Sequence, residues 1–213
     1  ESFKQSTLID ESVKSEFKKL TELAPLHNPA NLMGVEAVEK VLPGVPNVGV
    51  FDTAFHQSMK PENYLYALPY KWYEDYKIRR YGFHGTSHRY VSWRINEILW
   101  KNDLKVITCH VGNGASITAI KNGEVVETSM WLTPLEWVIM WSRCWNIDPA
   151  IIPFMMKKEN LNADQIDKIM NKESWVLWLS WKSSDHRDIE DGYNAGNERE
   201  YNCIVIWKSK KGP

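Results

Sequence analysis

Residues 104–128 read LKVITCHVGNGASITAIKNGEVVET and predict three consecutive β-strands. Residues 104–111 are apolar and β-branched, residues 116–121 alternate, and Asn122 followed by Gly123 is the strongest short signal for a hairpin turn. A strand, a glycine loop, a second strand, a tight turn and a third strand together form a compact β-meander.

Helical periodicity occurs on both sides of this meander. The segments whose apolar residues or capping signals indicate helices are residues 11–23, 28–41, 86–99, 151–158, 163–170 and 187–206. Residues 47–51 add a short β-rich run, and Thr86 or Ser87 is the expected N-cap of the helix that reaches about Leu99. The order predicts an α/β fold with a mixed sheet and flanking helices.

The composition is that of an ordinary globular protein, with 43% hydrophobic and 25% charged residues among 213. The 26 basic and 27 acidic side chains give a net charge of −1, which excludes a broad basic field for nucleic acid or anionic lipid. No apolar run reaches the roughly 20 residues of a membrane span. Cys109, Cys144 and Cys203 are widely spaced, which suits reduced thiols, so we expect a cytoplasmic protein that binds neither nucleic acid nor a membrane.

The loop between the first two strands of the meander, His110–Ser116, is a candidate anion site. Gly112 and Gly114 let backbone N–H groups approach a phosphate without a clash from a Cβ atom. A plain hairpin turn is the alternative interpretation of this loop.

Two earlier segments place polar side chains where ligands collect. Asp52 follows the β-rich run, at the kind of strand end where ligands gather in open α/β sheets, although a cap or turn acid is the alternative. Residues 79–88 contain two arginines, two histidines, two hydroxyls and two glycines just before a predicted helix, which favours an anion at its N-terminus. His84 and His88 are four residues apart, so a metal pair is a second interpretation, although no acidic third ligand is adjacent.

Two later segments complete the candidates. Arg143 lies in a region with few other cations and is a candidate clamp for a transferring phosphoryl group, with a surface ion pair to Glu136 or Asp148 as the alternative. Residues 183–188, SSDHRD, indicate a helix start whose free N–H groups can meet a nucleotide, or simply an ordinary N-cap.

Together and in this order, the segments resemble the acetate kinase family, the acetate and propionate kinase branch of the actin-like ATPase fold. The resembling segments are residues 24–32, 51–57, 79–88, 109–115, 128–130, 133–136, 148–150 and 183–188. The resemblance implies an incomplete actin-like ATPase (ribonuclease H-like) fold. It makes residues 1–100 the remainder of an N-terminal domain and residues 101–213 the start of a C-terminal nucleotide-binding domain.

The resemblance implies reversible transfer of the γ-phosphoryl group of ATP to acetate or another short carboxylate, giving an acyl phosphate and ADP, with Mg²⁺ and in a homodimer. It assigns Asp52, His84 and Arg143 to catalysis, the last two as the pair that stabilises the transition state. The residues that it assigns to the nucleotide are His110, Val111, Gly112, Asn113 and Gly114 on the phosphate side and Asp185, His186 and Arg187 on the adenosine side. His186 stands where the family often has an apolar or aromatic residue.

These assignments suit the chemistry of phosphoryl transfer. In-line transfer needs positive charge and hydrogen-bond donors around the equatorial oxygens, which Arg143, His84 and the loop amides can supply. A carboxylate substrate has no proton to remove, so we expect Asp52 to position groups or to order a metal-bound water.

Members of the resembled family are considerably longer than this chain. A strand and an arginine of the metal and carboxylate sites would precede Glu1, and a second metal ligand with an adenine-binding segment would follow Pro213. We therefore expect the Mg²⁺ ligands outside this chain, and a central fragment that is inactive by itself.

Eleven tryptophans among 213 residues is several times the usual frequency. Those that stand where the resembled family carries glycine are Trp100, Trp131, Trp137, Trp141, Trp145, Trp175, Trp178 and Trp181. Indoles at such positions would clash and block a cleft. We hypothesise that these codons are UGA, which some genetic codes read as glycine and others as tryptophan, whereas Trp72, Trp93 and Trp207 need not be affected. Genuine tryptophans in a decayed copy are the alternative.

Two other functions stay open from the sequence. A non-catalytic fragment or degenerate homologue would act at most as a binding or oligomerisation module. A metal-dependent hydrolase would use His84, His88, Cys109 and His110 and would contain zinc.

Overall fold

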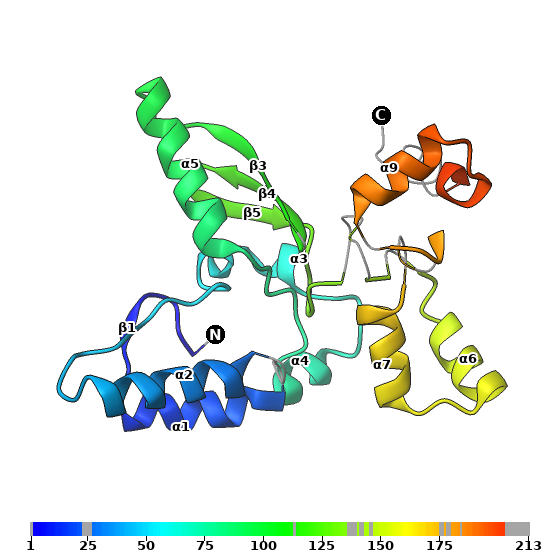
Figure 1. Cartoon of the computed structure of the whole chain (residues 1–213). Coiled ribbons are helices and arrows are strands. Elements are labelled where there is room, and N and C mark those ends of the chain that lie inside the picture. Colours follow the sequence, from blue (N-terminus) through cyan, green and yellow to red (C-terminus); the bar gives the residue numbers. More distant parts are fainter. Residues whose placement is uncertain are drawn as a thin grey trace.

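The computed structural model describes residues 2–22, 27–112, 114–135, 140, 143–144, 147–174, 177, 180–183 and 185–202. Its helices and strands are, in order, β1 (Thr7–Leu8), α1 (Glu11–Lys19), the 3₁₀ helix η1 (Leu20–Glu22), α2 (Asn28–Val41), β2 (Val48–Gly49), the 3₁₀ helix η2 (Phe55–Ser58), α3 (Pro61–Tyr64), α4 (Tyr70–Tyr76), α5 (Gly85–Leu99), β3 (Lys105–Val111), β4 (Ala115–Lys121), β5 (Glu124–Thr128), α6 (Ile151–Glu159), α7 (Ala163–Lys172) and α9 (His186–Asn194). Helix α5 lies along the sheet β3–β4–β5, and α1 and α2 lie side by side (Figure 1).

The α/β class is confirmed, and the meander forms as predicted, with β3, β4 and β5 as neighbouring antiparallel strands. Asn122 and Gly123 both have positive φ, 54° and 81°, as a two-residue hairpin turn requires. The mixed sheet is a correction, because all strand pairs in the described ranges are antiparallel, including β1 with β2. The short connections of the meander leave no room for the crossover that a parallel pair needs.

The two faces of the meander differ in burial. Thr108, Ser116 and Thr118 point to the buried face, where α5 and η2 pack against the sheet. Ile107 and Val111 lie on the other face and are 72% and 80% exposed. The alternation of the strands therefore directs small hydroxyl side chains, rather than large apolar ones, toward α5.

Two small apolar clusters hold the parts around the sheet together. In the first, Met59 packs on Ile120 and Val125 beneath η2. In the second, the buried Met130 packs with Ala115 and Met140, and Phe83 lies against them. The second cluster joins the start of β4 to the residue that precedes His84.

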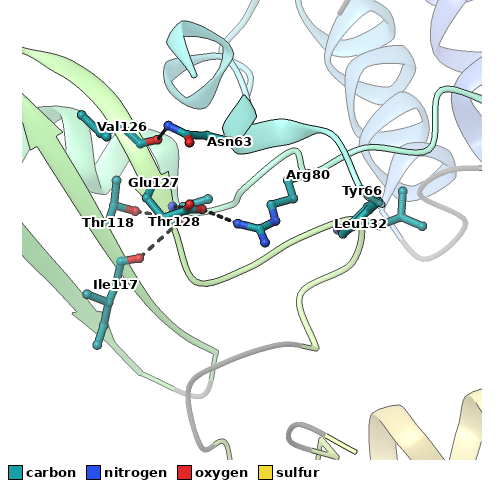
Figure 2. A network of polar contacts seen from close by, with 9 residues as sticks. All are labelled: Asn63, Tyr66, Arg80, Ile117, Thr118, Val126, Glu127, Thr128 and Leu132. Atoms are coloured by element: carbon teal, nitrogen blue, oxygen red, sulfur yellow. Dashed lines mark hydrogen bonds and ion pairs between the residues drawn. The ribbon is translucent and has the colours of Figure 1, made fainter. Parts of the chain in front are cut away.

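Polar contacts tie the segment 61–81 to strand β5 (Figure 2). The Asn63 side-chain amide donates to the Val126 carbonyl at 2.7 Å, and the Arg80 guanidinium forms an ion pair with Glu127. These contacts hold the segment that leads into α5 against the edge of the sheet.

The helix predictions differ from the structure mainly at the chain's C-terminal side. Helix α9 ends at Asn194 instead of reaching Ile206, because the chain turns at Gly196, whose φ is 79°. Residues 198–202 are helical again, and residues 203–206 lie outside the described residues. Helices α6 and α7 begin at the predicted residues, and Asn162 and Gln165 form a capping box at the start of α7.

Within the described residues, no helix is both long enough and apolar enough to cross a bilayer.

Candidate active site

The start of helix α5 is held by a carboxylate from far away in the sequence. His84 is the N-cap of α5 and has a φ of 58°, in the left-handed region. Its backbone N–H donates to Asp52 Oδ2 at 2.6 Å, and the Gly85 N–H donates to the Asp52 carbonyl oxygen at 2.8 Å. The prediction of Thr86 or Ser87 as the cap is therefore wrong, because Asp52 satisfies the first N–H groups of the helix.

Gly85 leaves the space that this close approach needs. A Cβ atom on Gly85 would overlap the Asp52 carbonyl oxygen, so any other residue would push the helix away from Asp52. Gly82 has a φ of 72°, and a Cβ there would lie 2.6 Å from the His56 ring. The two glycines of residues 79–88 therefore serve backbone packing at the site.

The imidazole of His84 lies between the sheet and the glycine loop. Its Nδ1 is 2.8 Å from Ser116 Oγ, and its ring stacks on His110 with 3.9 Å between ring centroids. The His110 Nδ1 is in turn 3.0 Å from Ser87 Oγ. His84 is thus fixed from two sides.

Three predicted site residues converge at the glycine loop. A Cβ atom on Gly114 would lie 3.3 Å from His84 Nε2 and 3.6 Å from Arg143 Nη1. A Cβ atom at 114 would therefore crowd the His84 ring, while it would meet Arg143 at an ordinary van der Waals distance. His84 and Arg143 face the same point beside the backbone of β4.

Arg143 is half-buried and held by the chain around it. Its Nη1 donates to the Pro134 carbonyl at 2.8 Å and contacts Met140 Sδ at 3.4 Å, and burial lowers the pKa of its guanidinium. No ion pair between Arg143 and Asp148 is found in the described part of the chain, and Glu136 lies outside it. Among the described residues, no carboxylate therefore forms an ion pair with the Arg143 guanidinium.

A cavity of about 570 Å³ connects these groups. Asp52, His84 and Arg143 line it together with Phe83 and Pro134, and Asp52 is the acidic residue of the lining. The sequence assigned no role to Phe83 and Pro134, although both lie within segments that carry the resemblance. A cavity that combines the guanidinium of Arg143 with an apolar wall suits a small anion with an apolar end.

A second set of histidines lies behind His84 in the interior. Both ring nitrogens of His88 meet hydroxyls at 2.7 Å, Nδ1 from Thr108 and Nε2 from Ser116. Burial, with the neighbouring His84 and His110, lowers the pKa of His88 to about 4, and burial with the neighbouring His88 and His84 lowers that of His56 to about 3. Burial also lowers the pKa of His84.

The zinc hydrolase interpretation does not fit this arrangement. His88 has no ring nitrogen left for a metal, because both are used by hydroxyls. Among the described residues, no group of three histidine, cysteine, aspartate or glutamate side chains could hold a metal ion. The described residues therefore do not form a Mg²⁺ site of their own, and the expectation that its ligands lie elsewhere stays a prediction.

The residues expected at the nucleotide divide into two places. In the glycine loop, the Gly112 N–H donates to the Gly114 carbonyl at 3.1 Å and Val111 is exposed, while Asn113 lies outside the described residues. Asp185 is the N-cap of α9, and its Oδ1 accepts from the Arg187 N–H at 2.9 Å, while the Arg187 guanidinium bonds the same carboxylate. His186 is the first residue of that helix.

The described tryptophans differ in the sign of their φ angle. Trp100 and Trp181 have left-handed φ values of 53° and 57°. Trp131 is half-buried without a positive φ, and its carbonyl accepts from the Tyr81 N–H at 2.9 Å. The tryptophans outside the described residues are Trp137, Trp141, Trp145, Trp175, Trp178 and Trp207.

The fold has close counterparts among solved structures. A crystal structure of Porphyromonas gingivalis acetate kinase matches with a TM-score of 0.90 and 48% identity, covering 98% of this chain and 53% of that one. A propionate kinase from Francisella tularensis matches with a TM-score of 0.91 and 38% identity, covering 96% and 53%. The architecture is thus that of the actin-like ATPase fold.

Sequence comparisons narrow this class. A model described as "Acetokinase family" matches residues 1–211, and the chain belongs to that family. It is 58% identical over 212 residues to an acetate kinase of Clostridioides difficile and 57% identical over 209 residues to one of Treponema denticola. These matches cover 99% and 97% of the chain but 53% of each relative, so the chain spans about half the length of the curated relatives.

Proposed function

We propose that the protein containing this chain transfers the γ-phosphoryl group of ATP reversibly to acetate or another short carboxylate, giving an acyl phosphate and ADP. The observation that carries this proposal is the approach of His84 Nε2 and Arg143 Nη1 to the same point at Gly114, on the wall of a cavity that also contains Asp52. Membership of the acetokinase family supports it.

The transferring phosphoryl group has to be stabilised by charge and hydrogen bonds. Its transition state is loose, with negative charge spread over three equatorial oxygens. A guanidinium at Arg143 and an N–H at His84 Nε2 would donate to those oxygens from adjacent directions. Amides of the glycine loop other than that of Gly112, which bonds to the Gly114 carbonyl, would hold the phosphates of the nucleotide. The chain's contribution is therefore electrostatic stabilisation and orientation.

The role that we propose for Asp52 is positioning. Acetate at neutral pH has no proton to remove, so a general base has nothing to do in this direction of the reaction. The hydrogen bond from the His84 N–H to Asp52 Oδ2 supports the positioning role, because it holds the left-handed backbone of the residue that carries the imidazole. Asp52 would thus set the direction of the His84 ring.

The acceptor carboxylate would lie between Arg143 and the apolar wall of the cavity. Phe83 and Pro134 line the cavity beside Arg143, so a methyl or ethyl group could contact them while the carboxylate meets the guanidinium. The described residues form no site for Mg²⁺, so its ligands would come from other parts of the protein.

We further propose that Asp185, His186 and Arg187 meet the adenosine side of the nucleotide and that the protein is a cytoplasmic homodimer. The domain division at residues 100 and 101 is part of the same proposal, because the start of the meander coincides with that point.

Formation of acetyl phosphate, trapped as a hydroxamate, tests the proposal. We expect ATP-dependent product from the complete gene product and none from this chain alone. Arg143→Ala should lower kcat far more than it raises the KM for ATP, because a contact made in the transition state acts on kcat. Arg94→Ala, which removes an exposed arginine paired with Glu97 on α5, is the matched control and should leave kcat unchanged.

Two results would count against the proposal. A complete protein that binds ATP without forming acetyl phosphate would favour the non-catalytic module. An Arg143→Ala variant that changes only the KM for ATP would contradict the role of Arg143 in the transition state.

A further inference from the structure

A line of hydrogen-bonded side chains runs from His84 into the interior of the protein. Ser116 Oγ is 2.8 Å from His84 Nδ1 and 2.7 Å from His88 Nε2, and His88 Nδ1 is 2.7 Å from Thr108 Oγ1. Ser116, His88 and Thr108 are 0%, 1% and 4% exposed. Water therefore cannot replace any of these partners, and the protons have to be shared within the line.

Counting protons allows only two arrangements. Ser116 has one hydroxyl proton and lies between two imidazoles, so it donates to one ring and accepts from the other. In the outward arrangement Thr108 donates to His88, His88 Nε2–H donates to Ser116, and Ser116 donates to His84 Nδ1. In the inward arrangement every bond is reversed.

One observation favours the outward arrangement, and the neutrality of the rings, which both arrangements share, then fixes the tautomer of His84. The inward one would end with the Thr108 hydroxyl donating to the Thr118 carbonyl, but these atoms are 3.5 Å apart, which is long for an O–H···O bond. Burial lowers the pKa values of His84 and His88, so each ring carries one proton. When His84 Nδ1 accepts from Ser116, the single proton of a neutral His84 has to lie on Nε2, which faces Gly114.

We propose that His88, acting through Ser116, is a positioning residue that keeps the proton of His84 on Nε2, directed at the transferring phosphoryl group. This inference rests on the proposed function for its last step. His88 donates its Nε2–H to Ser116 and thereby occupies the hydroxyl oxygen, so that the hydroxyl proton points to His84. Thr108 fixes the tautomer of His88 in the same manner.

The tautomer of His84 can be measured directly by ¹⁵N NMR of the imidazole nitrogens. We expect the Nε2–H tautomer in the unmodified chain and a mixture of both tautomers in Ser116→Ala, because no hydroxyl then donates to Nδ1. His88→Leu should give the same mixture, whereas His88→Gln, whose amide can donate to Ser116, should retain the Nε2–H tautomer. Ser92→Ala removes a buried serine of the same helix that bonds only to the Arg89 carbonyl among the contacts found, and should change nothing.

The proposal is overturned if Ser116→Ala leaves His84 entirely in the Nε2–H form, or if Ser92→Ala shifts it equally. In the complete protein, Ser116→Ala should lower kcat roughly tenfold with little change in the KM for ATP. The tautomer measurement needs no catalysis. A complete protein without kinase activity would therefore contradict the proposed function. The NMR result would still decide whether His88 and Ser116 set the tautomer of His84.

Two tryptophans carry a second, independent inference. Trp100 and Trp181 have left-handed backbones, which crowd the Cβ atom of an L-residue against its own carbonyl. Trp100 is 93% exposed and Trp181 69% exposed, so burial of the indole does not compensate that strain. Trp100 follows the last residue of α5, and the Lys101 N–H bonds back to the Asn96 carbonyl at 3.1 Å. This is the helix end at which glycine is the usual residue.

Other tryptophans provide the comparison. Trp72 and Trp93 lie inside α4 and α5 and have no positive φ. We infer that the natural protein carries glycine at positions 100 and 181, encoded by UGA, and tryptophan at 72 and 93. Trp131, which the resemblance also places at a glycine position, has no positive φ, so the backbone supports this inference at positions 100 and 181 alone.

The source DNA and the peptides of the natural protein test this inference together. We expect UGA codons and glycine-containing peptides at 100 and 181, and UGG codons with tryptophan-containing peptides at 72 and 93. Peptides with tryptophan at 100 and 181 would overturn the inference, as would UGG codons there.

Discussion

Helix α5 has a residue in the left-handed conformation at each end, and the two ends have opposite surroundings. At its start, the backbone of His84 is held by Asp52 and its ring by Ser116 and His110. At its end, Trp100 is 93% exposed and is fixed by backbone bonds of the helix terminus.

The difference shows when a strained backbone carries information about function. A left-handed residue costs free energy and persists where its neighbours leave it no alternative. His84 meets that condition, and it faces the cavity with Arg143. The Trp100 side chain has no such neighbours, because it is 93% exposed. Its left-handed backbone therefore indicates that glycine belongs at this position, and it does not indicate a functional site.

The largest effect should come from removing the side chain at the first end. His84→Ala in the complete protein should lower kcat about 10²–10³-fold, because a preorganised donor to the transition state is lost. Trp100→Ala, at the other end of the same helix, should leave kcat unchanged. Steady-state kinetics of acetyl phosphate formation measures both, and equal losses would remove the contrast between the two ends.

A smaller effect, on the free energy of unfolding, should follow from a methyl group added at the N-terminal end of α5. Gly85→Ala puts a Cβ against the Asp52 carbonyl oxygen and should lower the free energy of unfolding by about 1–3 kcal/mol. Gly34→Ala is the control, because nothing lies within 4 Å of a Cβ there, inside α2, and it should stabilise by about 0.5–1 kcal/mol. Urea denaturation measures both changes, and a stable Gly85→Ala variant would show that Asp52 does not fix the helix start.

The buried histidines behind the first end should make stability depend on pH. The folded-state pKa values of His56 and His88 are lowered to about 3 and about 4, so the unfolded chain binds protons that the folded chain does not. The free energy of unfolding should therefore fall as pH decreases from about 6.5 toward 4, by about 1.4 kcal/mol per pH unit for each histidine. Denaturation at several pH values should give a smaller slope for His56→Leu than for the unmodified chain, and an unchanged slope would mean that His56 does not contribute.

The smallest expected effect is a change in Tm from a substitution of Trp100, at the C-terminal end of α5. Trp100→Gly should raise Tm by roughly 2–4 °C, because relief of the left-handed strain is worth about 1 kcal/mol. Trp93→Gly, in the right-handed interior of the same helix, should lower Tm by a similar amount. A lower Tm for Trp100→Gly would contradict the strain argument.

Local patterns predicted the fold well where the structure itself is local. The meander follows from strand alternation and one turn dipeptide, and its predicted bounds match β3, β4 and β5 closely. The cap of α5 was wrong because its partner, Asp52, is 32 residues away from His84 and no spacing rule points to it. The expected mixed sheet is not found among the described strands, because the short connections of the meander allow antiparallel pairs alone there.

The candidate site was predictable in its residue types and in part of its geometry. Asp52, His84 and Arg143 line one cavity, and Gly114 lies beside His84 and Arg143, while the roles that the resemblance assigns to them stay predictions. The use of Asp185 and its neighbours for the nucleotide stays a prediction. Thr108 had no signal in the sequence, and Ser116 was noticed only as the end of the glycine loop, because a small hydroxyl on a buried strand face looks like any other strand residue.

The short connections of the meander also set an order of events in folding. β3 and β4 are joined by residues 112–114, and β4 and β5 by residues 122–123, so both hairpins close within microseconds from neighbouring chain. The bonds of His84 to Asp52 and to Ser116 each span 32 residues and form only after α5 has docked. We therefore expect the glycine loop to form before the histidine reaches it, and we expect the amide of His84 to lose its protection in hydrogen exchange sooner than the amides of β4.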